Sequence, residues 1–379
     1  MPVPSTHIST PLAERILARI RANGSITFAD YMAECLYHPK LGYYSRAEAR
    51  RFADYYTSVD VHPIFGRLLA RQLAEMWEVL GRSARFEVVE GGAGTGRLAS
   101  HILDFAARAL PQFYFALHYT AVESSAARRA MHAQLIGAHI AAGRARSSAA
   151  FPQEISVGCI FSNELLDALP VHRVLGRSDG LREILVGVGG ERLADHEAPL
   201  SSPALAEYFA QQGVTLVVGQ QAEAALAAAG WMEAAGRRLG RGFVLTIDYG
   251  HDARELYNHR HLRGTLLAYR NHRADEDFYA APGEQDLTAH VSFTALDLAG
   301  RRAGLARTGL VSQTQFLLAL GRGNEFADLY NEGQSETDRI LARLLLKNLI
   351  HPEAMGETFQ VFVQHKGVAA PKLTGLQPL

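Results

Sequence analysis

One short segment, FEVVEGGAGTGRL (Phe86 to Leu98), constrains the fold of this chain more than any other. An apolar run, FEVVE, stands directly before glycines at alternate positions, and a helical pattern begins after them. Glycine has no Cβ, so such a turn can bend sharply and lie close against a flat ligand. A strand, a glycine turn and a helix in this order predict the first unit of a Rossmann-like α/β sheet that binds a cofactor.

Three further apolar runs are typical of strands covered on both faces, because they are apolar throughout rather than alternating. They are LHYTAVES (117–124), VGCIFSNE (157–164) and GFVLTIDYG (242–250). Near the end of the chain, FQVFVQHKG (359–367) alternates in the manner of an edge strand. We therefore expect an α/β fold with a mostly parallel sheet and one antiparallel strand near the C-terminus.

The segment before the glycine motif predicts helices. One begins at Pro11 with Thr10 as its N-cap, a second runs from about Phe28 to Cys35, and a third runs from Ile64 to Gly81. We expect an N-terminal helical segment over residues 1–81.

Residues 82–379 are expected to form the core domain, interrupted by two insertions. The insertion at about 175–240 contains a hairpin pattern, LREILVGVGGERL, and an alanine-rich helix. The insertion at about 251–293 is polar and irregular, and it is rich in His, Arg and Tyr.

Composition excludes several classes of protein. The net charge of −1 and the pI of about 7.0 argue against a surface that neutralises phosphates, so nucleic acid is not expected as a partner. Two cysteines, Cys35 and Cys159, cannot make a disulfide framework or a thiolate zinc site. The N-terminal residues do not resemble a secretory signal, and no apolar run reaches the roughly 18 residues of a membrane span. We expect a cytoplasmic protein without membrane insertion.

Five histidines in the second insertion resemble a metal cluster at first sight. Their spacings match no common ligand pattern, and no cysteine joins them, so we expect surface or substrate-facing histidines and no metal. These residues are His251, His259, His261, His272 and His290.

The spacing of the glycines discriminates among cofactors. A dinucleotide fingerprint would read G-x-G-x-x-G and would place a pyrophosphate at the helix N-terminus. Here Gly92, Gly94 and Gly96 give G-x-G-x-G, with Arg97 after the last glycine. S-adenosylmethionine carries no phosphate and needs close backbone approach without an anion cradle. The pattern therefore predicts S-adenosylmethionine as the cofactor, with a purely structural loop as the alternative.

Acidic residues at two strand ends support this prediction. Glu90 ends the first strand and suits a ligand that carries a positive amino group and a sulfonium. Glu123 ends the second strand, where a carboxylate can accept hydrogen bonds from ribose hydroxyls. Thr57 and Ser58, in the segment DYYTS, are further candidates for cofactor binding, with an ordinary helix cap as the equal alternative.

The segment SNELLDALPV (162–171) follows the third strand and carries the candidate reacting groups. Asn163 is expected at the carboxyl end of the strand, where open parallel sheets bind ligands. Glu164 and Asp167 are three residues apart and are expected to share one face of a short helix that Pro170 ends. Such carboxylates could hold a cationic guanidinium by bidentate hydrogen bonds, whereas the alternative is that they only cap and solvate the helix.

Six segments between Ile26 and Phe293 resemble the MidA family of methyltransferases, and the last is long and unlike generic Rossmann sequence. They are ITFADYMAECLYHPKLGYYS, YYTSVDVHPIFG, FEVVEGGAGTGRL, NELLDALPVH, IDYGH and LRGTLLAYRNHRADEDFYAAPGEQDLTAHVSF. The resemblance implies a Rossmann-like class I methyltransferase sheet with inserted lid segments. Mitochondrial members of that family assist assembly of respiratory complex I and are regarded as protein-arginine methyltransferases.

Carried over by position, the resemblance adds Asp248 to the acceptor-side candidates Asn163, Glu164 and Asp167. The remaining matches to the family's post-strand and next-strand motifs are Pro170, His172, Tyr249 and Gly250. The chain departs from the family in two regions. It has Gly91, Ala93, Thr95 and Arg97 where the family usually has Leu, Pro, Arg and Thr, and it has Val59, Asp60, Val61 and Arg67 in the region where the family reads TSPEI and FGE.

The sequence thus predicts methyl transfer from S-adenosylmethionine to a protein nitrogen, with arginine favoured by the resemblance alone. The resemblance also implies a protein partner, a respiratory-complex subunit among the candidates. One alternative is a cofactor-binding assembly or chaperone protein with little catalysis, and another is a NAD-dependent oxidoreductase on the same fold. The oligomeric state is left open, a homodimer included.

Overall fold

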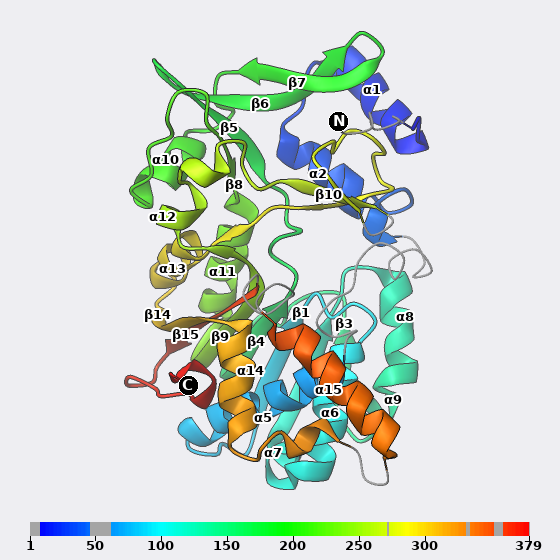
Figure 1. Ribbon diagram of the computed structural model, residues 1–379, viewed down its shortest axis with the longest axis vertical. Coiled ribbons are helices and arrows are strands. Elements are labelled where there is room, and N and C mark those ends of the chain that lie inside the picture. The colour runs from blue at the N-terminus through cyan, green and yellow to red at the C-terminus, as the bar shows by residue number, and fades with distance from the viewer. Residues whose placement is uncertain (1–7, 46–61, 271–272, 331–333, 352–358, 379) are drawn as a thin grey trace. The chain divides into compact units, whose positions relative to one another are not determined.

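The computed structural model describes residues 8–45, 62–270, 273–330, 334–351 and 359–378 (Figure 1). The contacts between residues divide the folded chain into two compact units, and each unit is assembled from three segments of the sequence. The first unit comprises residues 1–55, 166–231 and 250–299, and the second comprises residues 56–165, 232–249 and 300–379. These boundaries differ from the expected ones at 1–81 and 82–379. The N-terminal residues and most of both expected insertions fall into one unit, whereas the helix that begins at Ile64 belongs with the Rossmann-like sheet.

The second unit is built on a sheet of order β14-β15-β9-β4-β1-β2-β3. The short strand β13 pairs with Gly250 and His251 at the end of β9, and these residues are assigned to the first unit. Five adjacent strands of this sheet run parallel to one another, in the order β9, β4, β1, β2 and β3. The four parallel strands that the sequence predicted are confirmed, whereas β3 and β14 were missed. The bounds are β1 Phe86–Gly91, β2 Leu117–Val122, β3 Ala145–Ser148, β4 Ile155–Asn163, β9 Leu239–His251, β13 Val291–Ser292, β14 Ala306–Ser312 and β15 Phe359–Lys366.

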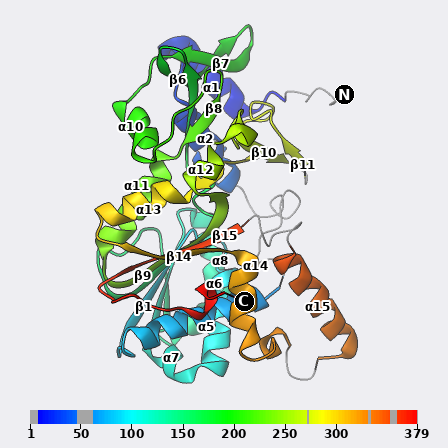
Figure 2. The same cartoon turned by 60° about the vertical axis from the view of Figure 1, so that its left-hand side comes forward.

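The last strand, β15, is antiparallel as predicted, but its expected place at an edge is wrong. It lies between β9 and β14 and is antiparallel to both, as Figure 2 shows. Its central residues 361–364 are buried, because the sheet continues beyond them. Strand β14 forms this edge instead, with partly exposed side chains along its length.

Helices pack against this sheet and share its apolar core. Phe86 and Val88 of β1 lie in one buried cluster with Leu98 and Ile102 of α6 and Phe65 of α5. The helices that lie within the second unit are α5 Ile64–Val79, α6 Arg97–Ala109, α7 Pro111–Ala116, α8 Ala126–Leu135, α9 Gly137–Ala141, α14 Gln313–Arg322 and α15 Glu336–Ile350, with 3-10 turns η4 Ala327–Leu329 and η6 Thr374–Leu376. Two helices, α11 Leu226–Arg238 and α13 Phe293–Arg302, cross the boundary between the units.

The first unit contains two antiparallel sheets and several short helices (Figure 1). Its four-stranded sheet has the order β7-β6-β5-β8 and includes the predicted hairpin, and its three-stranded sheet has the order β11-β10-β12. The region 251–293 is therefore less irregular than expected. The bounds are α1 Pro11–Asn23, α2 Phe28–Tyr37, η1 Tyr43–Ser45, β5 His172–Arg177, β6 Gly180–Gly189, β7 Arg192–Ala198, α10 Pro203–Gln211, β8 Gln221–Ala224, α12 Ala253–Leu256, η3 His259–His261, β10 Leu267–Arg270, β11 Arg273–Asp275 and β12 Asp286–Thr288.

The N-terminal helices begin where local chemistry predicts. Thr10 accepts a hydrogen bond from the amide of Ala13 at 3.0 Å, and Pro11 occupies the first turn, where its missing N–H leaves no donor unsatisfied. Thr27 caps α2 in the same way through the amide of Asp30. The predicted start of α1 is confirmed.

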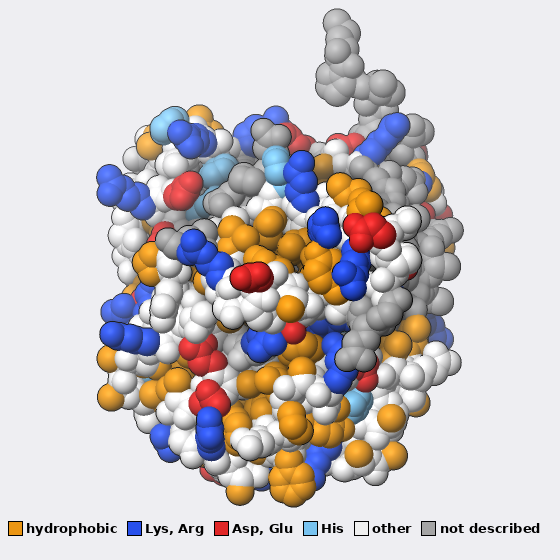
Figure 3. Space-filling view, turned by 60° about the horizontal axis from the view of Figure 1, so that its bottom comes forward, with side chains coloured by type: hydrophobic (Ala, Val, Ile, Leu, Met, Phe, Trp, Pro, Cys, Tyr) orange, Lys and Arg blue, Asp and Glu red, His pale blue; other side chains and the backbone are white. Residues whose placement is uncertain are grey.

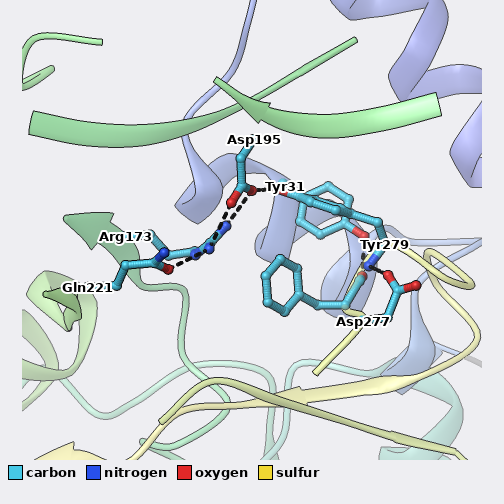
Figure 4. Close-up of polar contacts among 7 residues, drawn as sticks. Tyr31, Arg173, Asp195, Gln221, Asp277 and Tyr279 are labelled. Carbon is cyan, nitrogen blue, oxygen red and sulfur yellow. Dashed lines mark hydrogen bonds and ion pairs between the residues drawn. The ribbon is translucent and has the colours of Figure 1, made fainter. Parts of the chain in front are cut away.

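A buried arginine joins the three segments of the first unit (Figure 4). The Arg173 guanidinium on β5 donates to both carboxylate oxygens of Asp195 on β7, at 2.6 and 3.0 Å. Its central carbon lies 5.3 Å from the ring centroid of Phe28 and 4.6 Å from that of Phe278. The Tyr279 hydroxyl also donates to Asp195, at 2.8 Å. The planar guanidinium of arginine can stack on aromatic rings and form paired hydrogen bonds at the same time. Arg173 therefore has a fastening role: it holds the three segments of the unit together.

Candidate functional site

The glycine loop connects β1 to α6, and its backbone explains the three glycines. Gly92, Gly94 and Gly96 have φ angles of +70°, +55° and +87°, in the left-handed region that other residues avoid. Space is also limited, because a Cβ at Gly92 would lie 2.9 Å from the Leu165 side chain. The loop therefore requires glycine for conformation at all three positions.

Glu123, the predicted ribose-binding acid, lies beside this loop. One of its carboxylate oxygens accepts a hydrogen bond from the amide of Gly94 at 2.9 Å, and the other accepts from the amide of Ser125 at 2.8 Å. The side chain is buried at the end of β2. The second of these oxygens also accepts from the Ser124 hydroxyl at 3.4 Å, whereas the oxygen bonded to Gly94 has a further lone pair that could accept a hydrogen bond from a ribose hydroxyl. The loop and this acid together fit a flat adenosyl group without a phosphate.

Glu90, at the end of β1, is buried, and only 3% of it is exposed. The Tyr119 hydroxyl on β2 donates to its carboxylate at 2.7 Å. Burial raises the pKa of Glu90 from 4.5 to about 7, and the Tyr119 hydrogen bond offsets part of that rise. The carboxyl group is therefore partly protonated near neutral pH, and a cation bound beside it would favour the charged form.

Replacing Glu90 by glutamine should remove one component of the pH dependence of stability. Folding raises the pKa of this carboxyl, so its contribution to stability is complete below pH 4.5 and is lost as the pH rises through about 7. The loss is on the order of 3 kcal/mol. Urea unfolding at about pH 5 and about pH 8 measures it.

The difference between wild type and Glu90→Gln isolates this group from other titrating residues. Glu154→Gln, at an exposed position of the same unit, serves as the control and should keep the wild-type pH profile. An unchanged profile in Glu90→Gln would show that Glu90 is not the group responsible.

The segment after β4 differs from the prediction. Residues 164–169 form turns rather than a helix, so the proposed shared helical face of Glu164 and Asp167 is wrong. The physical reason is the backbone of Glu164, whose φ of +51° is left-handed and incompatible with an α-helix. Glu164 is assigned to the second unit and Asp167 to the first.

Asp248 and Asn163 lie on the neighbouring strands β9 and β4, where Asn163 is in register with Ile247. Asp248 is fully buried, and its carboxylate accepts hydrogen bonds from the amides of Leu165 at 3.3 Å and Tyr249 at 3.1 Å. It therefore holds the segment that follows Asn163. The Asn163 amide donates to Glu164 at 3.0 Å, while its buried oxygen has no hydrogen-bond partner among the described residues. A buried amide oxygen requires a donor, which a cationic nitrogen would supply.

In the first unit, Asp167 lies near aromatic side chains that the sequence analysis missed. Burial raises the pKa of Tyr269, and the charges of Asp167 and Asp286 raise it further. The Tyr44 hydroxyl donates to Asp286 at 2.8 Å. Tyr269 and Asp286 both lie in the MidA-like segment 262–293, which the sequence analysis had singled out. The pattern of polar and aromatic residues in that segment does not predict that Tyr269 lies near Asp167.

Three of the five histidines come together in the first unit. The ring centroids of His251, His261 and His290 are 5.6–6.3 Å apart, and His259 is exposed. Burial and the two neighbouring rings lower the pKa of His290 to about 4. Throughout the described parts of the chain, no group of three or more His, Cys, Asp or Glu side chains is arranged to hold a metal ion. His272 lies outside the described residues.

Thr57 and Ser58 also lie outside the described residues, so their predicted contact with the cofactor stays a prediction. Both cysteines are buried, and burial raises the thiol pKa of Cys35 to about 12. On the face shown in Figure 3, Lys and Arg side chains are interspersed with hydrophobic and acidic ones. None of the described helices is both long enough and apolar enough to span a membrane.

Comparisons with known proteins agree with this site. A crystal structure from Burkholderia thailandensis, of a COG1565 superfamily member described as a "likely methyl transferase" and bound to S-adenosyl-homocysteine, is similar with a TM-score of 0.85 and 31% sequence identity. The match covers 98% of this chain and 97% of that one. The protein arginine methyltransferase NDUFAF7 of Danio rerio is 27% identical, with 94% of this chain and 87% of the relative covered. The human protein of the same name is 27% identical, with coverages of 95% and 84%.

These relatives correct one expectation. The curated proteins from Danio rerio, Rattus norvegicus and Homo sapiens are named as mitochondrial, which contradicts the predicted cytoplasmic location. The prediction of a cytoplasmic location rested on composition and on the N-terminal residues, and these features carry no information on the location of related proteins.

A family model supplies the identification. Described as S-adenosyl-L-methionine-dependent methyltransferase, it matches residues 68–311, which include the glycine loop, Glu123 and the segment after β4. The similarity to MidA methyltransferases inferred from sequence motifs is thereby confirmed, as are the Rossmann-like fold and the cofactor class. The chain belongs to this family of S-adenosylmethionine-dependent methyltransferases.

Proposed function

We propose that the protein methylates a nitrogen of a protein substrate, with the guanidinium of arginine as the acceptor. The observation that carries this proposal is the pairing of Asn163 and Glu164 at the strand end beside the glycine loop. The names of the curated relatives, protein arginine methyltransferases, support the same acceptor. The MidA resemblance extends the proposal to a subunit of a respiratory complex as the substrate protein.

In this proposal, Gly92, Gly94 and Gly96 lie against the cofactor, Glu123 binds its ribose, and Glu90 favours its positive charge. When bound, S-adenosylmethionine supplies an activated methyl group, so the protein's task is to orient and deprotonate the acceptor. Thr57 and Ser58 complete the proposed cofactor residues.

On the acceptor side, the Asn163 oxygen and the Glu164 carboxylate would accept hydrogen bonds from the guanidinium and restrict its rotation. Asp248 would act through the backbone, because it holds the amide of Leu165. Asp167 remains a candidate for recognition of the acceptor's charge. The left-handed backbone of Glu164 costs about 1–2 kcal/mol, a strain typical of residues kept for function.

Two measurements test the proposal. Calorimetry should show micromolar binding of S-adenosylhomocysteine, about 8 kcal/mol, and no binding of NAD. Binding of NAD without S-adenosylhomocysteine would favour an oxidoreductase and reject the assignment. Mass spectrometry of methylated proteins, in the host with and without this protein, should then reveal a methylarginine that depends on it. Dependence of a different methylated residue would overturn the choice of arginine.

Glu164→Gln should lower turnover by at least about tenfold, or about 1.4 kcal/mol, while the affinity for S-adenosylhomocysteine stays unchanged. The substitution keeps the shape of the side chain and removes the charge that orients a cation. Single-turnover methylation of the acceptor found by mass spectrometry measures the effect.

Glu325→Gln is a matched control for this experiment. Glu325 is also a glutamate with left-handed backbone, at φ +52°, but it is exposed on the surface, so its replacement should leave turnover unchanged. Glu164→Gly should relieve backbone strain and keep or raise stability while turnover falls. Full turnover in Glu164→Gln would shift the proposed role to Asp167, which Asp167→Asn tests in the same assay.

A further inference from the structure

Helix α8 buries one side chain, and that side chain is a histidine. The helix covers the end of the sheet near β3, and its other residues are exposed or partly exposed. His132 is only 1% exposed. A lone histidine in an otherwise polar surface helix has no evident role in sequence, which is why the sequence analysis passed over it.

Both ring nitrogens of His132 are engaged. Nε2 lies 2.9 Å from the carbonyl oxygen of Gly94, and Nδ1 lies 2.8 Å from the hydroxyl of Ser147 on β3. A carbonyl oxygen only accepts hydrogen bonds, so Nε2 must carry the hydrogen and donate it. In the neutral ring Nδ1 then accepts from the Ser147 hydroxyl. The imidazole thus links the glycine loop to the neighbouring strand.

The same loop residue is held from its other side by Glu123. The amide of Gly94 donates to the Glu123 carboxylate, and its carbonyl accepts from His132, so the peptide groups on both sides of Gly94 are tied. The imidazole also lies close to the last glycine of the motif, because a Cβ at Gly96 would lie 3.0 Å from His132 Cδ2. His132 therefore defines the space that the loop occupies as well as its hydrogen bonding.

We infer that His132 is a positioning residue of the cofactor site, which acts through Gly94 to hold the glycine loop in its binding conformation. This inference rests on the proposed role of the loop in binding S-adenosylmethionine. A loop with left-handed glycines has many accessible conformations, and fixing one of them beforehand lowers the entropy that binding must overcome. The contribution should be the same for S-adenosylmethionine and S-adenosylhomocysteine, since the loop is held before either ligand arrives.

A second histidine of the same unit offers a matched control. His139 on α9 is 7% exposed, and its two ring nitrogens also have partners, Tyr114 at 2.7 Å and Asp104 at 3.0 Å. Those partners belong to α7 and α6, so this imidazole joins helices rather than the glycine loop. Both histidines should contribute to stability, but only His132 should affect the ligand.

The test compares His132→Leu, His132→Gln and His139→Leu by calorimetry with S-adenosylhomocysteine. His132→Leu should lower the affinity at least about tenfold, and the affinity for S-adenosylmethionine should fall by the same factor. His132→Gln keeps an N–H donor for the Gly94 carbonyl and should recover the affinity to within about threefold of wild type. His139→Leu should unfold more easily than wild type and bind with unchanged affinity.

Hydrogen exchange of the peptide 90–98 in the ligand-free protein gives an independent readout, and it should accelerate in His132→Leu but not in His139→Leu. If His132→Leu does not fold, Ser147→Ala decides the question, because it frees one end of the imidazole and should lower affinity about threefold. Wild-type affinity and exchange in folded His132→Leu would reduce His132 to a purely structural role. A wild-type protein that binds no S-adenosylhomocysteine would instead reject the cofactor proposal, and exchange alone would then decide whether His132 fixes the loop.

Discussion

Replacing Gly94 by valine should lower the affinity for S-adenosylhomocysteine about 1000-fold, or about 4 kcal/mol. At φ +55° a β-branched residue is strained, so the loop should relax away from its native conformation. Relaxation breaks the hydrogen bonds of Gly94 to Glu123 and His132, and the ligand must then restore both the conformation and the bonds. Calorimetry on the folded variant measures the loss.

Gly143→Val controls for backbone strain alone. Gly143 has a similar φ of +69°, and a Cβ there would meet open space, so its replacement should lower stability without altering affinity. Near-native affinity in folded Gly94→Val would mean that the loop only connects β1 to α6.

Replacing Arg173 by alanine should lower the free energy of unfolding of the first unit by about 4 kcal/mol. The substitution removes two charge-assisted hydrogen bonds to Asp195 and the contact with the Phe28 and Phe278 rings. It also loosens three segments that are distant in sequence, because Arg173 lies where they meet. Urea unfolding, followed by a probe in the first unit, measures the change.

Arg177→Ala is the matched control on the same strand. Arg177 also pairs with a glutamate of β7, Glu197, but both side chains are well exposed, at 42% and 38%. Its replacement should leave the free energy of unfolding almost unchanged, because water screens an exposed ion pair. Arg173→Lys should fall between the two alanine variants, since lysine keeps the charge and loses the planar paired bonds. Equal losses in Arg173→Ala and Arg177→Ala would contradict the fastening role of Arg173.

The features that could be predicted from sequence depend on neighbours along the chain. The apolar runs of β1, β2, β4 and β9 and the cap at Thr10 report local backbone preference and burial on both faces of a sheet. The glycine spacing reports a backbone conformation, which the φ angles of Gly92, Gly94 and Gly96 match. Glu123 was predicted at the end of the second strand, and in the structure its carboxylate accepts a hydrogen bond from the amide of Gly94 in the loop.

The features that were missed or wrong depend on residues far apart in sequence. Strand β15 has an alternating pattern, yet β14 covers its outer side, and only strand pairing decides which strand lies at the edge. The expected helix after Asn163 fails because Glu164 bonds to the backbone of β9, which a local helical pattern does not contain. In the same way, His132 has a role only because tertiary packing brings α8 to the glycine loop.

The sequence alone thus determined the parallel sheet, the left-handed glycine loop and the family, because these follow from short-range backbone chemistry and from motifs along the chain. Only the tertiary structure decided which segments assemble into each unit, where Asp167 and Asp248 lie, and which side chains hold the loop. Those outcomes are set by packing between residues of different segments, such as Arg173 with Phe28 and Phe278, and the sequence pattern of no single segment predicts these contacts.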